Sequence, residues 1–81
     1  MEKRLAVINI IVTDKNSVMK VNEILHDFGR DIIGRLGVPY GEKNVAVICI
    51  IMDAEPQQVS ALSGKLGMLS GVTAKTMTAK I

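Results

Sequence analysis

Few residues in this sequence have the side chains that catalysis or metal binding usually needs. There is one histidine, His26, and one cysteine, Cys49, far apart in the chain. A zinc or nickel site needs several ligands at close spacing, and a cysteine nucleophile needs a base beside it. We expect His26 to face solvent on a helix and Cys49, inside an apolar run, to be a core or interface residue. The sequence therefore predicts no catalytic residue, no metal site, no cofactor and no enzyme.

The glycine-rich stretch ALSGKLGMLSGV, from Ala61 to Val72, is the other place where a ligand could bind. A phosphate-binding P-loop requires G-x-x-x-x-G-K followed by Ser or Thr, but here Gly64-Lys65 is followed by Leu66. GKLG also matches the G-x-x-G of KH domains, although the order of elements is wrong for that fold. Glycine costs about 1 kcal/mol in a helix interior. We therefore interpret Ser60, Gly64 and Gly67 as a helix side that lets another helix or strand pack closely.

Composition narrows the classes of partner. The formal net charge is +2, without a run of like charge, and aromatic residues make up 2% of the chain. The sequence therefore does not indicate a nucleic-acid-binding surface. The single cysteine excludes an intramolecular disulfide and fits a reducing compartment. The longest apolar run, Val45 to Met52, is too short to span a bilayer. We expect a cytoplasmic protein that interacts with neither membrane nor DNA.

Hydrophobic spacing then gives the elements that position these residues. Apolar residues at steps of three and four predict helices, and β-branched runs predict strands. Asp14 or Asn16 could cap the first helix, Gly29 and Gly71 could end the two helices, and Pro56 suits a first helical turn. The predicted order is strand 4–13, helix 14–29, strand 30–39, strand 45–52, helix 56–71 and strand 72–80.

The βαββαβ order has one favoured compact solution, the ferredoxin-like fold. This α+β sandwich has an antiparallel four-stranded sheet with both helices on one face. Right-handed crossovers place the first and third strands at the centre. With no internal linker, the sequence predicts a single domain over residues 1–81.

Both central strands are apolar on both faces, which a sheet with one solvated face would not show. If the core takes Ala6, Ile8, Ile10 and Val12 with Ala46, Ile48, Ile50 and Met52, the opposite face stays open, and the reverse assignment leaves the same problem. The sequence therefore predicts a homodimer or higher homo-oligomer. The expected interface residues are Leu5, Val7, Asn9, Ile11, Val45, Val47, Cys49 and Ile51, with Asn9 as the polar exception.

These residues also carry a family resemblance. DKNSVMKVNEILHDFGRDI resembles the first loop and helix of ACT domains, the small ligand-binding modules of amino-acid metabolism. VSALSGKLGMLSGVTAKTM resembles the last helix and strand of ACT domains and of the C-terminal domain of nickel-responsive repressors. More closely, nearly the whole chain resembles stand-alone proteins named as iron-only hydrogenase system regulators, at LGVP, VNEILHDF, ALSGKLG and SGV.

The resemblance implies a regulatory module with a small-molecule effector bound near the first loop, at Asp14, Asn16 and Ser17. Amino-acid-binding ACT domains usually have a glycine where this loop enters the helix, and this chain has none there. Nickel-responsive repressors use several histidines and a cysteine at the start of a central strand, where this chain has Asn44-Val45, so nickel sensing does not carry over. Their ribbon-helix-helix segment would precede Met1, so we expect no direct DNA binding.

Three hypotheses for function follow from the sequence. The first is a non-catalytic ACT-like regulatory module that acts through oligomerisation and a small ligand at a subunit interface. The second is an assembly or adaptor domain without a ligand, and the third is an enzyme with an unrecognised site. A ligand that raises the melting temperature would distinguish the first from the second.

Overall fold

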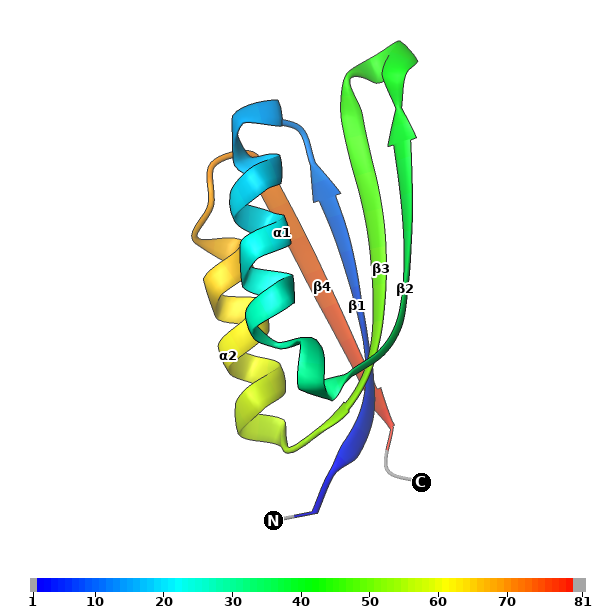
Figure 1. Cartoon of the computed structure of the whole chain (residues 1–81), viewed down its shortest axis with the longest axis vertical. Coiled ribbons are helices and arrows are strands. Elements are labelled where there is room, and N and C mark those ends of the chain that lie inside the picture. The colour runs from blue at the N-terminus through cyan, green and yellow to red at the C-terminus, as the bar shows by residue number, and fades with distance from the viewer. Residues whose placement is uncertain (1, 80–81) are drawn as a thin grey trace.

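The computed structural model describes residues 2–79, and it has two helices on one side of one sheet (Figure 1). The elements follow in the order β1 (Arg4–Val12), η1 (Lys15–Ser17), α1 (Val18–Asp27), η2 (Gly29–Asp31), β2 (Ile32–Tyr40), η3 (Gly41–Lys43), β3 (Val45–Ala54), α2 (Pro56–Gly67) and β4 (Val72–Ala79), where η marks a 3₁₀ turn. Lys80, the predicted end of the last strand, lies outside the described residues, as do Met1 and Ile81 of the predicted domain.

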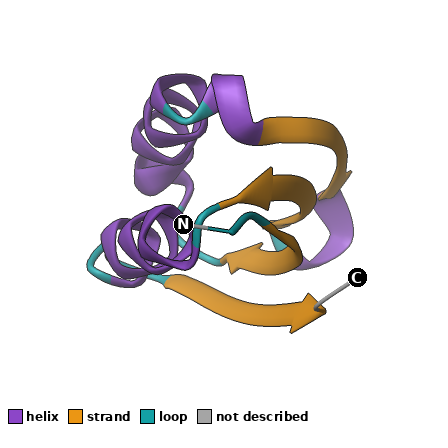
Figure 2. Ribbon diagram, turned by 90° about the horizontal axis from the view of Figure 1, so that it is seen from below, coloured by secondary structure: helices purple, strands orange, loops and turns teal. Residues whose placement is uncertain are grey.

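The sheet has the strand order β2-β3-β1-β4, and every neighbouring pair is antiparallel. The two central strands are β1 and β3, as the sequence predicts, and β2 and β4 form the edges. Figure 2 shows both helices on the same side of the curved sheet. The fold is therefore the predicted ferredoxin-like α+β sandwich.

The core lies between the helices and one face of the sheet. Alternate residues of the two central strands are fully buried there, including Ile8, Ile10 and Ile50. The helices contribute Val21 and Leu25 from α1 and Val59, Leu62 and Leu66 from α2. The structure thus decides between the two face assignments that the sequence left open, and Ala6, Ile8, Ile10 and Val12 belong to the core.

Helix α1 begins after a short 3₁₀ turn and ends earlier than expected. The Asp14 carboxylate accepts a hydrogen bond from the backbone N–H of Asn16 at 3.0 Å, so Asp14 is the cap, although it caps η1 rather than α1 itself. The prediction for Gly29 was wrong, because Gly29 is not left-handed and starts η2. The N–H of Asp31 bonds to the carbonyl of Phe28, and this 3₁₀ turn leads directly into β2.

Helix α2 has Pro56 in its first turn, as predicted, but its last residue is Gly67. The sequence placed its end at Gly71, which was wrong by one turn. Leu69 lies in the following turn, yet it still packs against the core, and this explains why it fits the helical spacing. Gly71 has φ +68°, the left-handed conformation that glycine adopts without strain. Its role is to turn the chain into β4.

No helix within residues 2–79 is long and apolar enough to cross a bilayer.

Candidate functional site

The sheet face away from the helices carries most of the predicted site residues. We call it the outer face. The register of β1 and β3 places Val7 opposite Ile51, Asn9 opposite Cys49, and Ile11 opposite Val47. Because each pair shares one face of the sheet, these side chains form three adjacent rows. Leu5 and Val45, at opposite ends of the face, are half-buried.

Apolar side chains on the outer face are accessible in the isolated chain. Ile11 is 45% exposed and Val47 and Ile51 are each 40% exposed, even though they lie on the central strands. A central strand of a two-layer fold normally shows polar residues on its uncovered face. The prediction that one apolar face of the two central strands stays open is therefore confirmed for the isolated chain.

The edge strands enlarge this face with residues that the sequence analysis missed. On β2, Leu36, Val38 and Tyr40 pair with Cys49, Val47 and Val45, and on β4, Met77 pairs with Val7. Leu36 is 65% exposed and Met77 is 67% exposed. The alternation of Leu36, Val38 and Tyr40 was visible in the sequence, but Gly34 and Gly37 interrupt the run and weaken it as a strand signal.

Polar groups of the outer face lie in its middle row and at its Leu5 end, where the exposed Asp53 pairs with Leu5. The middle row reads Leu36, Cys49, Asn9 and Lys75 across the four strands. Asn9 is exposed and Cys49 is a free, half-buried thiol. The rows on either side, Ile51–Val7–Met77 and Val38–Val47–Ile11, are apolar apart from Thr73 at one end.

The predicted ligand residues of the first loop form contacts within the chain. The Ser17 hydroxyl is buried and donates a 2.6 Å hydrogen bond to the Ser70 carbonyl. Beside it, the N–H and the hydroxyl of Thr13 both donate to the Gly71 carbonyl, at 2.7 and 3.1 Å. The loop after β1 is thus fastened to the turn before β4. Ligand binding by Asp14, Asn16 and Ser17 remains a prediction from the sequence.

The small-residue side of α2 is open within the chain. Gly64 and Gly67 are exposed, and apart from the adjacent backbone of α2 and the two chain neighbours, a Cβ built at either one meets no heavy atom of the described residues within 4 Å. No helix or strand of the same chain packs closely there, so the predicted close approach would require another chain. Ser60 and Gly64 instead border a pocket between α2 and β4.

The single histidine and the single cysteine lie on different parts of the fold. His26 is exposed on α1, as predicted, whereas Cys49 lies on the outer face of the sheet. Within residues 2–79, no three His, Cys, Asp or Glu side chains come together in a group that could hold a metal ion.

A ferredoxin-like domain with an open apolar sheet face is the class of protein that this geometry defines. Residues 4–76 match the family described as "TM1266-like: Iron-only hydrogenase system regulator, putative". The chain belongs to this family.

Solved structures agree with this assignment. The uncharacterized protein TM1266 from Thermotoga maritima is 41% identical, with a TM-score of 0.93, over 98% of this chain and 100% of that one. The C-terminal domain of the MgtC protein from Mycobacterium tuberculosis is 15% identical, with a TM-score of 0.68, over 95% of this chain and 88% of that domain. An unknown protein from Galdieria sulphuraria is 14% identical, with a TM-score of 0.66 over 99% of this chain but 47% of its own length. The last two show the fold alone, and no curated protein matches the chain.

Proposed function

We propose that this chain is a non-catalytic regulatory module that works as a homo-oligomer assembled through its outer face. The observation that carries the proposal is the exposure of Ile11, Val47 and Ile51 on the two central strands. Contiguous apolar patches of this kind mark interaction sites in soluble proteins. The family description supports a regulatory role, in a system that contains an iron-only hydrogenase.

The size of the outer face suits a second copy of the chain. β1 and β3 have 9 and 10 residues, and strands rise by about 3.3 Å per residue, so the face is about 30 Å long. Four strands about 4.8 Å apart make it about 19 Å wide. Two such faces would bury about 1,100 Å² in total, above the roughly 1,000 Å² expected of a biological interface.

A two-fold axis would also suit the distribution of polar groups. In an isologous interface both copies use the same surface patch, so residues close to the two-fold axis face their own copies on the partner. A polar row at the centre of the patch would then face the polar row of the partner. The row of Asn9 and Cys49 lies between two apolar rows, so an axis near it pairs Asn9 with its own copy or with a neighbouring polar group. Such a pair would help to fix the register of two faces whose central rows are mostly apolar.

The resemblance of the first loop and helix to ACT domains adds a small effector to this proposal. The first loop, with Asp14, Asn16 and Ser17, is where the resemblance locates it. Asn16 has an exposed side chain, whereas the Ser17 hydroxyl bonds to Ser70. A ligand-free adaptor domain is the alternative, and it would use the same outer face.

The test is a pair of matched lysine substitutions. Val47→Lys puts a charge in the apolar row beside the middle row of the outer face. A partner would bury this charge without a counter-ion, so we expect the assembly to weaken by at least about 100-fold. Val47 is 40% exposed in the isolated chain, so the variant should stay folded. Met19→Lys, at an exposed position of α1, is the control and should keep the wild-type mass.

Light scattering gives the mass, and circular dichroism checks the fold. A folded Val47→Lys variant with the same oligomeric mass as the wild type would contradict the proposed interface.

A further inference from the structure

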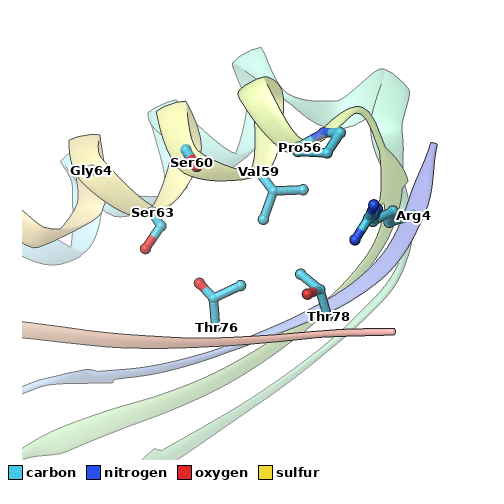
Figure 3. Close-up of a pocket in the computed structure, with 8 residues that line it drawn as sticks. All are labelled: Arg4, Pro56, Val59, Ser60, Ser63, Gly64, Thr76 and Thr78. Atoms are coloured by element: carbon cyan, nitrogen blue, oxygen red, sulfur yellow. The ribbon is translucent and has the colours of Figure 1, made fainter. Parts of the chain in front are cut away.

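A pocket opens between helix α2 and the edge strand β4, on the helix side of the sheet (Figure 3). Its volume is about 520 Å³, within the roughly 300–1,000 Å³ of small-molecule sites. The pocket exists because the residues on its two sides are small. Ser60, Ser63 and Gly64 face it from α2, and Thr76 and Thr78 face it from β4.

One charged side chain borders this pocket. Arg4, near the start of β1, closes one end, and Figure 3 shows its guanidinium turned toward the space between helix and strand. The Arg4 Nε is buried and has no hydrogen-bond partner among the described residues. Buried donors of charged groups nearly always have a partner in native proteins, supplied by the protein, a water or a ligand. A guanidinium presents its N–H groups as a fork that matches a carboxylate or a phosphate.

The rest of the lining can hold the body of a ligand. Four hydroxyls, those of Ser60, Ser63, Thr76 and Thr78, surround the space, and each can donate or accept. None of them takes part in the side-chain hydrogen bonds found within residues 2–79. Val59 adds an apolar wall.

The helix itself also favours an anion. Pro56, in the first turn of α2, lies at the Arg4 end of the pocket (Figure 3), so the positive end of the helix dipole is close to the guanidinium. Among residues 2–79, no Asp or Glu lines the pocket to oppose this charge.

From this arrangement we propose that the pocket binds a small organic anion. The carboxylate or phosphate of the ligand pairs with Arg4, and the hydroxyls on α2 and β4 hold its polar body. This site is independent of the outer face, because one chain supplies all its walls and they lie on the opposite side of the sheet. A monomeric protein would contradict the proposed oligomer and leave this pocket intact.

The experiment uses anions of both kinds. ¹⁵N-labelled protein is titrated with inorganic phosphate and glycerol 3-phosphate in one arm and with succinate and glutamate in the other, at constant ionic strength. Glycerol is the uncharged control. We expect saturable amide shifts at residues 60–64 and 76–78 in at least one arm, and the responding arm identifies the anionic group.

Matched variants assign the binding to the pocket. Arg4→Met should weaken the responding anion at least about tenfold, because it removes a charge-assisted hydrogen bond, whereas Arg30→Met, at an exposed arginine outside the pocket, should leave it unchanged. Thr76→Val keeps the shape of its side chain and loses one hydroxyl, so it should weaken binding about threefold, and it carries the test if Arg4→Met does not fold. The proposal is overturned if no anion gives saturable shifts, if the shifts lie elsewhere, or if folded Arg4→Met and Arg30→Met bind alike.

Discussion

Replacing Gly64 and Gly67 by alanine should stabilise the protein. Both glycines belong to α2, and neither has a positive φ, so alanine can adopt the same backbone conformation. Apart from the adjacent backbone of α2 and the two chain neighbours, a Cβ at either position meets no heavy atom of the described residues within 4 Å. Gly-to-Ala gains about 1 kcal/mol in a helix interior, where Gly64 lies, and less at the last helical residue, Gly67. The double variant should therefore gain between about 1 and 2 kcal/mol, equivalent to roughly 5–15 °C in melting temperature for a domain of this size.

The assay is urea and thermal unfolding followed by circular dichroism, with wild type and variant at the same protein concentration so that assembly affects both alike. Light scattering checks that the variant keeps the wild-type mass. A folded variant that is less stable than the wild type, or that has lost its assembly, would refute the reasoning. It would mean that another chain packs closely against Gly64 and Gly67, as the sequence alone suggested.

Three further predictions concern the loop contacts and DNA. Gly71→Ala should destabilise the protein by more than about 2 kcal/mol, because the residue has φ +68° and the new Cβ would lie 2.6 Å from the Cβ and 2.8 Å from the backbone nitrogen of Asp14. Unchanged urea unfolding would contradict this prediction. Ser17→Ala removes the 2.6 Å hydrogen bond to the Ser70 carbonyl and should cost about 1–2 kcal/mol, with Ser70→Ala, which keeps that carbonyl, as a near-neutral control in the same assay. In gel shifts at physiological salt the protein should bind DNA no tighter than about micromolar, and tighter binding with sequence preference would refute the expectation.

The topology of this fold could be predicted because its signals are local. The alternation in β1 and β3 and the three- and four-residue steps from Val59 to Leu66 locate the strands and helices, and the handedness of the crossovers then orders the sheet. The ends of the helices were less predictable. Glycine often marks a helix end, but Gly29 starts a 3₁₀ turn instead. Gly71 belongs to the turn before β4, which the loop after β1 holds in place through the hydrogen bond from Thr13.

The choice between the two sheet faces was not accessible to pattern reasoning. Ile8 and Val7 are equally apolar, so composition does not say which one the helices cover. The structure shows that the helices cover Ile8 and leave Val7 on the outer face. The choice depends on where the crossovers carry the helices, which is a property of the whole chain.

The pocket was out of reach for a different reason. Arg4 borders the pocket only because the folded chain brings α2 and β4 beside the start of β1, so its place in the sequence gives no signal. Ser60 and Thr76 lie far apart in the sequence, and nothing local relates them. Small polar residues in a helix and in an edge strand give a signal only when the two elements face each other.

The mass of the unliganded wild-type protein in solution tests the central claim most directly. Light scattering behind a sizing column, at micromolar concentration and over a tenfold dilution, measures it without a ligand, a partner or a substitution. The proposed assembly through the outer face predicts at least twice the chain mass of 8.8 kDa. A folded protein that runs at 8.8 kDa throughout would contradict it, because the apolar rows of β1 and β3 would then be stable in water.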